Sequence, residues 1–360
     1  MRRLVLGLLL VILLVSISQA QLLIGSRSSG MGGTGVASAR DQSAAYYNPA
    51  ALMKMGKAGF MASAGVSYSG IDKLMSAASS STDPAKFAAD NFGTKLDVDG
   101  NINGLIGGSF NKVGITVLPA LTLNVFKDAN SLVANGGAAA GYTGILTLGY
   151  SFGLIGISSV DVGANLKYLG GMLGTIIAGV NPVTGTAAGE ERYGSQSGFG
   201  LDVGALLTFD IPAVTSLSVG IAARDLAETI TSSLKKKDLT QAAGSNTYTE
   251  GPEQDLGSQS STADSTYVLG VSGTIPVIGA VLAADLESGK NFSNTHFGLE
   301  YPLMANFLAL RAGMASGNNL SLTTLGAKVG IPFFTLNLAY VINGKDSKAS
   351  QIVLDLAGGF

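Results

Sequence analysis

Apolar and polar residues alternate after Gly59, in segments of about ten residues. From Val160 to Tyr168, every second residue is apolar or aromatic, and the residues between them are Asp161, Gly163, Asn165 and Lys167. Because a strand points successive side chains to opposite faces, this period of two predicts strands with one apolar and one polar face. The segment 199–209 has the same pattern, and Leu206 alone falls on the polar face.

We delimit about fourteen such segments. They span approximately residues 58–69, 102–110, 112–126, 141–152, 158–169, 197–209, 215–226, 265–275, 278–288, 294–302, 305–314, 321–330, 333–342 and 350–360. Connections after even segments are short, whereas those after odd segments include four long ones, namely Ile71 to Asn101, Lys127 to Ala140, Gly170 to Gln196 and Ala227 to Asp264. This predicts an all-β fold, a transmembrane antiparallel up-and-down β-barrel over residues 58–360 with both termini at the short-turn end.

Composition supports a barrel over a soluble fold. Only 13% of the residues are charged and the mean hydropathy is +0.37, whereas soluble domains contain about 25% charged residues. No apolar run of about 20 residues follows the N-terminus, which excludes a helical membrane protein. A soluble β-sandwich is the alternative, but its polar face would carry Lys and Glu, and here that face carries mostly Gly, Ser, Thr and Asn.

The N-terminus predicts export. Residues 1–20 contain Arg2 and Arg3, an apolar run from Leu4 to Val15, and a small-residue site ending at Ala20, as in a cleaved signal peptide. The absence of Cys is compatible with an oxidising compartment. The net charge of −2 gives no reason to expect a nucleic-acid partner.

The segment 21–57 differs from the rest because it is rich in Gly and Ser and ends in Tyr46-Tyr47-Asn48-Pro49-Ala50. That composition predicts a compact irregular segment. Gly30, Gly32 and Gly35 match G-x-G-x-x-G. We reject a dinucleotide site because no buried parallel strand precedes the match and no βαβ unit surrounds it.

This Gly-rich run, followed by Asp41 and Asn48-Pro49-Ala50, resembles the start of mature proteins of the FadL-like outer-membrane superfamily, which includes long-chain fatty-acid transporters and PorV-type components of the type IX secretion system. The resemblance implies a bacterial outer-membrane barrel of about fourteen strands with a lumenal plug and a lateral opening for hydrophobic substrates. The plug would contain Arg27, Gly30, Gly32, Gly33, Gly35, Asp41, Asn48, Pro49 and Ala50. Phe360 resembles the signal that outer-membrane assembly machinery recognises.

Charged residues on the polar faces predict a network inside the barrel. They are Asp161, Lys167, Asp202, Arg224, Lys328 and Asp355. Because buried charges need partners, we expect opposite signs to face one another, and Arg27, Arg40 and Asp41 to pair with these charges. His296 is the only histidine and no Gly-x-Ser-x-Gly motif is present. We therefore expect a lumenal or structural histidine, no enzymatic activity, no metal site and no cofactor.

Two functions remain open. One is passive uptake of long-chain fatty acids or other hydrophobic molecules, in which Leu74, Met75 and Phe87 of the first long connection would capture the substrate. The other is a PorV-type role without transport, in which outer loops bind a secreted protein or a secretion-system component. The polar stretch Ala227 to Asp264, which we expect to be a solvated loop, would offer such a surface.

Overall fold

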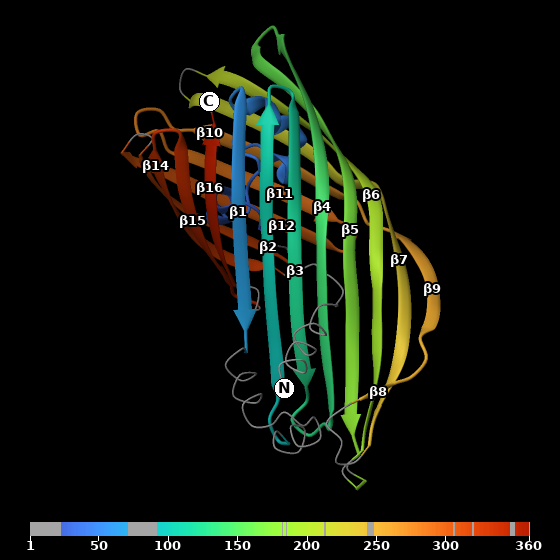
Figure 1. Ribbon diagram of the computed structural model, residues 1–360. Helices are drawn as coiled ribbons and strands as arrows, with labels where there is room; N and C mark the ends of the chain where they lie inside the picture. Colours follow the sequence, from blue (N-terminus) through green and yellow to red (C-terminus); the bar gives the residue numbers. More distant parts are fainter. Residues whose placement is uncertain are drawn as a thin grey trace.

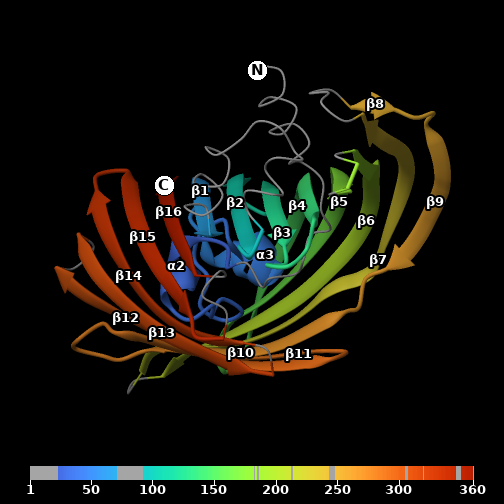
Figure 2. The same ribbon diagram turned by 90° about the horizontal axis from the view of Figure 1, so that it is seen from below.

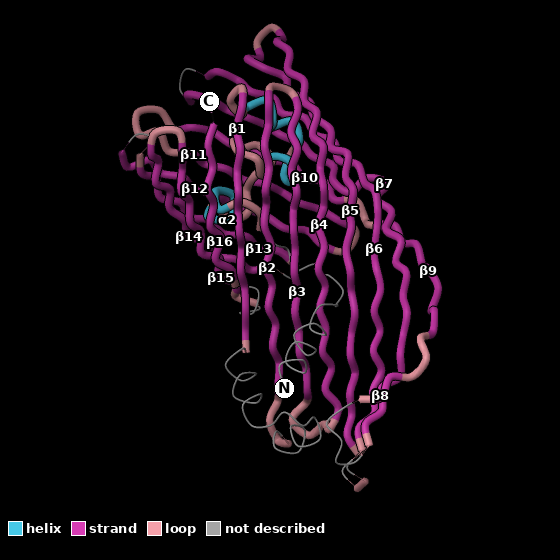
Figure 3. Tube along the Cα trace, in the orientation of Figure 1, coloured by secondary structure: helices cyan, strands magenta, loops and turns pink. Residues whose placement is uncertain are grey.

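In the computed structural model, the chain forms a closed antiparallel barrel (Figures 1 and 3). The structure describes residues 23–70, 92–181, 183–184, 186–211, 214–242, 248–304, 307–318, 320–345 and 350–359. The described part contains a sheet of sixteen strands, and fourteen of these form the wall once β8 and β9 are set aside. Pairing of β1 with β16 and of β7 with β10 closes the ring, which confirms the predicted fold.

Each of the fourteen predicted segments corresponds to one wall strand. The wall consists of β1 (Ala58–Ser69), β2 (Leu96–Phe110), β3 (Val113–Lys127), β4 (Val133–Leu154), β5 (Ile157–Val180), β6 (Ala187–Ile211), β7 (Val214–Gln241), β10 (Thr266–Thr274), β11 (Val281–Gly289), β12 (Phe292–Met304), β13 (Leu308–Gly317), β14 (Ser321–Ile331), β15 (Phe334–Asn343) and β16 (Gln351–Gly359). Gly59 of β1 pairs with Gly359 of β16, so the wall begins and ends at the short-turn end.

Three predicted long loops are largely strand, which corrects the sequence interpretation. The stretch Lys127 to Ala140 contains the start of β4, which pairs with β5 from Val133 and with β3 from Asn135. The stretch Gly170 to Gln196 contains the ends of β5 and β6, which stay paired up to Val180 and Ala187. The stretch Ala227 to Asp264 contains the end of β7, β8 (Thr249–Glu250) and β9 (Gln254–Thr262), and β8 and β9 each pair with β7. We call the sheet formed by the described residues within 170–198 and 229–262 the tongue (Figure 1).

The tongue escaped prediction because its apolar and polar residues do not alternate, as the adjacent apolar pairs Met172-Leu173 and Ile176-Ile177 and the polar run Lys235 to Lys237 show. Its strands are stabilised instead by ladder hydrogen bonds and by cross-strand ion pairs. Lys235 Nζ lies 2.6 Å from Glu253 Oε1, and Lys237 Nζ lies 2.9 Å from Glu250 Oε2. The Lys235 to Lys237 run therefore belongs to a paired sheet and is not a solvated loop.

The apolar side chains of the wall point outward, as the alternation predicts. On β5, Leu166 is 55% exposed while Asp161 and Asn165 are buried. On the outside, aromatic rings of Tyr142, Tyr168 and Phe199 lie side by side across β4 to β6, with centroids 6.2 and 5.1 Å apart. Such rings favour the headgroup level of a membrane.

Residues 23–57, called the N-terminal segment below, lie inside the barrel (Figure 2). They form α2 (Ser26–Gly30), α3 (Ala44–Tyr47) and the 3₁₀ turn η1 (Pro49–Lys54). Leu206, the one residue that broke the alternation of its strand, is fully buried and packs with alanines of this segment: Ala37, Ala39, Ala44, Ala50 and Ala51. The exception therefore marks where the segment contacts the wall.

Among the described residues, no helix combines the length and the apolarity needed to cross a membrane.

Candidate functional site

The first half of the N-terminal segment lies with its backbone directly on β12, β13 and β14. Gly32 has a φ of +71°, and a Cβ atom there would lie 2.5 Å from the Phe297 carbonyl oxygen. A Cβ atom on Gly298 would lie 2.5 Å from the Met31 carbonyl oxygen. Thr324 Oγ1 accepts a 2.9 Å hydrogen bond from Gly32 N and donates one of 3.0 Å to the Gly30 carbonyl. The Gly-rich run thus permits contact between two backbones.

The second half fits against glycines of β5, β6 and β7. A Cβ atom on Gly163 would lie 2.5 Å from Ala50 N, and Gly204 faces the Asn48 amide. The Asn48 side chain donates hydrogen bonds to the carbonyls of Val36 (2.8 Å) and Ala205 (3.2 Å) and accepts one from Ala50 N (3.0 Å). This fully buried side chain therefore fixes the Asn-Pro-Ala turn to the segment and to the wall.

Ion pairs hold the first half to the short strands. Arg27 donates to both carboxylate oxygens of Glu300, at 3.0 and 3.1 Å, and Arg311 Nε donates to Glu300 Oε2 at 2.6 Å. Arg27 also donates to the Ser38 carbonyl, which closes the loop between α2 and α3. Because two guanidinium groups share one carboxylate, Glu300 links Arg27 of the segment to Arg311 of the wall and balances one of their two positive charges.

Further carboxylates and His296 bind the backbone of the segment. Asp285 Oδ2 accepts from the N–H groups of Gly35 (2.7 Å) and Val36 (3.0 Å). Asp355 Oδ2 accepts from Ser26 N (2.6 Å) and Ser26 Oγ (2.5 Å). His296 Nδ1 lies 2.7 Å from the Gly32 carbonyl oxygen, so the histidine is lumenal and contacts the segment.

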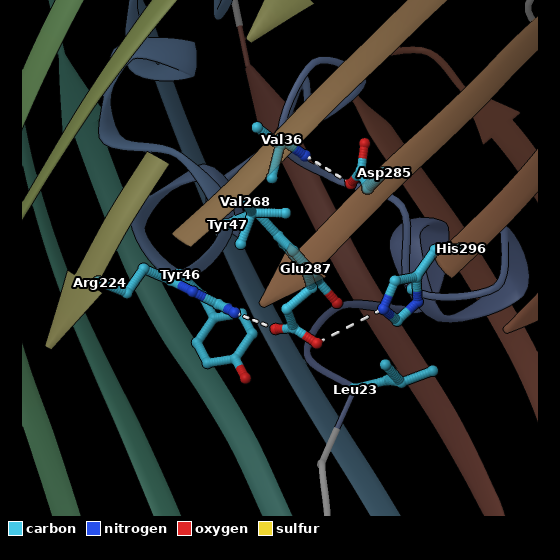
Figure 4. A pocket seen from close by; sticks show the side chains of 10 residues that line it. Leu23, Val36, Tyr46, Tyr47, Arg224, Val268, Asp285, Glu287 and His296 are labelled. Carbon is cyan, nitrogen blue, oxygen red and sulfur yellow. Dashed lines mark hydrogen bonds and ion pairs between the residues drawn. The ribbon is translucent and has the colours of Figure 1, made fainter. Parts of the chain in front are cut away.

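A small cavity of about 20 Å³ remains between the segment and β7, β10, β11 and β12 (Figure 4). At the edge of the cavity, Arg224 pairs with Glu287, and Arg224 Cζ lies 5.1 Å from the centroid of the Tyr46 ring. His296 Nε2 lies 3.5 Å from Glu287 Oε2 on the opposite side. One water needs roughly 10–15 Å³ of such volume, so the cavity has room for a single water and none for a hydrocarbon.

Burial perturbs one group of the segment that lines this cavity. It raises the pKa of the Tyr47 phenol well above its usual value, so the ring stays neutral. Outside the cavity, Arg40 donates to the carbonyls of Ala37 (3.0 Å) and Ala39 (2.6 Å).

Four of the six predicted lumen charges face an opposite charge. Lys54 of the segment lies 2.8 Å from Asp161, and Lys167 lies 3.0 Å from Asp202 and also contacts Asp225 and Glu228. Arg224 pairs with Glu287. Asp355 instead binds Ser26, and Lys328 forms no salt bridge with any described residue.

The expected partners of the segment's own charges were partly wrong. Arg27 pairs with Glu300, which was not among the predicted residues. Arg40 binds backbone carbonyls, and Asp41 accepts from Ser43 N within the segment at 3.0 Å. The sequence analysis missed four wall residues that contact the segment or its partners: Asp285, Glu287, Glu300 and Arg311. All four lie inside predicted strands, so the alternation could have identified them as lumenal.

The wall is irregular in several places, and two of them lie in β3 and β7. The β2–β3 ladder skips Leu118 and Pro119, because proline has no N–H to donate. On β7, Asp225 and Ala227 have positive φ angles of 60° and 51°, and the register with β6 shifts beside them. At the same place the neighbour of β7 changes from β10 to β9.

The candidate capture residues Leu74, Met75 and Phe87, the signal peptide 1–20 and Phe360 lie outside the described residues. Within the described ranges, no three His, Asp or Glu side chains are arranged to hold a metal ion.

No protein-family model and no curated protein matched the sequence. Solved structures of similar fold were found. A Pseudomonas aeruginosa FadL homologue has a TM-score of 0.59 and 12% identity, covering 93% of this chain and 97% of that chain. The Pseudomonas putida toluene transporter TodX has a TM-score of 0.56 and 12% identity, with coverages of 93% and 98%. The Ralstonia pickettii toluene transporter TbuX has a TM-score of 0.56 and 14% identity, with coverages of 93% and 97%. The chain therefore has the FadL-like barrel fold.

Proposed function

We propose that this protein mediates passive uptake of hydrophobic small molecules across a bacterial outer membrane, with residues 23–57 as its plug. The observation that carries the proposal is the filled lumen: the barrel is closed, its outer face is apolar, and the plug is bound to both sides of the wall. An open porin channel would be lined by water instead. The proposal involves no catalytic step.

The 20 Å³ cavity beside Tyr46 admits no organic molecule, so passage at this point requires the plug to move. The two halves of the plug differ in their freedom to do so. The second half leads directly into β1 at Ala58 and is thereby tied to the wall. We therefore assign the movement to the first half, residues 23–43, which is held by side-chain hydrogen bonds and ion pairs.

The similar structures support the substrate class, since two of them are described as toluene transporters and one as a FadL homologue. The signal peptide predicted for residues 1–20 supports export of the chain toward the outer membrane. Bilayer lipid would then contact the apolar outer face.

The tongue is the feature that best fits the alternative, a PorV-type barrel that binds a secreted protein. Its edge strand β9 is exposed along its whole length and pairs on one side with β7. Uptake accounts better for the molecule, because a docking barrel would not need the network of contacts that binds the plug in the lumen.

Flux into liposomes tests the proposal. Purified wild-type barrel should admit toluene and labelled oleate faster than protein-free liposomes, and a variant lacking residues 27–50 should change the rate. Flux equal to that of empty liposomes for both substrates would refute uptake. In that case, recovery of one defined secreted protein by the wild type, and its loss when residues 229–262 are shortened, would establish the alternative.

A further inference from the structure

His296, the only histidine of the chain, joins the plug to the wall on the lumenal side of β12, and it is buried. Its Nδ1 atom lies 2.7 Å from the Gly32 carbonyl oxygen of the plug. Its Nε2 atom lies 3.5 Å from Glu287 Oε2 on β11 (Figure 4). A Cβ atom on Gly33 would lie 3.0 Å from Nδ1, so a glycine at this position lets the plug backbone reach the ring.

Both neighbours of the ring are hydrogen-bond acceptors. The Gly32 carbonyl can only accept, and Glu287 already accepts from Arg224 and, at 2.9 Å, from Asn294 Nδ2. A neutral imidazole carries one N–H and one bare nitrogen, whereas an imidazolium carries an N–H on each nitrogen. Either neutral form would therefore turn a lone pair toward an oxygen atom. The doubly protonated ring is the form that donates on both sides.

The charges around the ring favour the same form. The titratable and charged groups that face it come from β11, β7 and the plug, and they are Asp285, Glu287, Arg224, Tyr46 and Tyr47. On the other neighbouring strand, the uncharged Ala315 of β13 pairs with His296. With both carboxylates ionised, this group has one more negative than positive charge. A proton on His296 balances that charge, which matters because an uncompensated charge is costly away from water.

We propose that His296 is a positioning residue that binds the plug as an imidazolium, so that seating of the plug takes up one proton and its release gives that proton back. Hydrogen bonds from a charged donor are roughly twice as strong as those between neutral groups. Loss of the proton therefore weakens the bond to Gly32 and ends the attraction to Glu287.

The sign of the pH dependence follows from this difference in bound protons. The seated plug binds one proton more than the released plug, so mildly acidic pH favours seating and alkaline pH favours release. Among the described side chains that bind the first half of the plug, including Thr324, Asp285 and Glu300, the imidazole is the one whose ordinary titration range lies near neutral pH. Its effect on uptake rests on the proposed function, whereas the protonation itself does not.

Nuclear magnetic resonance of the full-length barrel in detergent, with ¹⁵N-labelled histidine, tests the protonation directly. Because the chain has one histidine, the spectrum contains one pair of ring nitrogens. An ordinary histidine is about 90% neutral at about pH 7.5. The wild type should show two protonated nitrogens at that pH, and a variant lacking residues 27–50 should show a largely neutral ring.

Two point variants separate the causes. Glu287→Gln keeps the plug and removes the carboxylate, so its ring should also be largely neutral at the same pH. Glu253→Gln is the matched control, because it removes a carboxylate of the tongue, and it should keep the imidazolium of the wild type. Heat-modifiable gel mobility verifies that each variant is folded.

Conductance in planar bilayers measures the effect on the plug. Wild-type conductance of potassium chloride should rise about threefold from about pH 6 to about pH 9, as the plug loses the imidazolium. His296→Gln retains a side-chain N–H for the Gly32 carbonyl but cannot titrate, so it should show no such rise.

A neutral ring in the wild type at the test pH would overturn the inference. An imidazolium that persists without residues 27–50 would overturn it too, because protonation would then be independent of the plug. An equal conductance rise in the wild type and His296→Gln would assign the pH effect to other groups and contradict the coupling. If the ring behaves as proposed but toluene flux equals that of empty liposomes, uptake fails while the role of His296 stands.

Discussion

The two sides of the barrel hold the plug by different means. The short strands β11 to β16 bind its first half through charged and polar side chains, with Glu300, Asp285 and Asp355 as acceptors. The long strands β5 to β7 hold its second half through Gly163 and Gly204, the buried Asn48 turn and the ion pair of Lys54 with Asp161. Glycines fit the plug to the wall on both sides, so the difference is that the first half depends on more carboxylates of the wall.

Glu300→Gln should have the largest effect on this arrangement. It removes the one carboxylate that Arg27 and Arg311 share, and breaking a buried ion pair costs about 3–5 kcal/mol. We expect the first half of the plug to detach, which would raise the ion conductance of the barrel in planar bilayers. Glu253→Gln on the tongue is the control and should leave conductance unchanged. Wild-type conductance in Glu300→Gln would show that the ion pairs do not hold the plug.

Asn48→Ala should have an intermediate effect. It removes the hydrogen bonds from Asn48 to Val36 and Ala205 and leaves buried carbonyl groups without that donor, at about 1–3 kcal/mol. Because the glycine fit remains, we expect a lower thermal unfolding temperature with little change in conductance. A rise in conductance equal to that of Glu300→Gln would mean that the two halves are released together.

Lys237→Ala should have the smallest effect. Its ion pair with Glu250 is exposed on the tongue, and solvent and salt screen such pairs. We expect wild-type toluene flux and conductance. A marked loss of flux would show that the tongue takes part in uptake. Uptake would then not depend on the lumen alone.

Alternation along the sequence was sufficient to predict the barrel because each wall strand separates lipid-facing from lumenal residues. Leu206 could be recognised in the sequence as an exception to this pattern. Its packing against Ala37 and Ala50 could not be predicted, because it depends on the fold. The tongue was missed because its apolar residues come in adjacent pairs, Met172-Leu173 and Ile176-Ile177, and do not alternate with polar ones. The pairing of Arg27 with Glu300 joins residues far apart in the sequence, so no local pattern contained it.

A reversible tether between plug and wall tests most directly whether uptake requires the first half of the plug to move. Ser26 Oγ and Asp355 Oδ2 lie 2.5 Å apart, and the chain contains no native Cys, so Ser26→Cys combined with Asp355→Cys places two thiols within reach of a short bis-methanethiosulfonate cross-linker, which forms one reducible disulfide with each. The two single variants serve as controls. The account predicts that the cross-linked double variant loses toluene flux and regains it after reduction. Equal flux in the cross-linked and reduced states, with the cross-link verified by mass spectrometry, would contradict it.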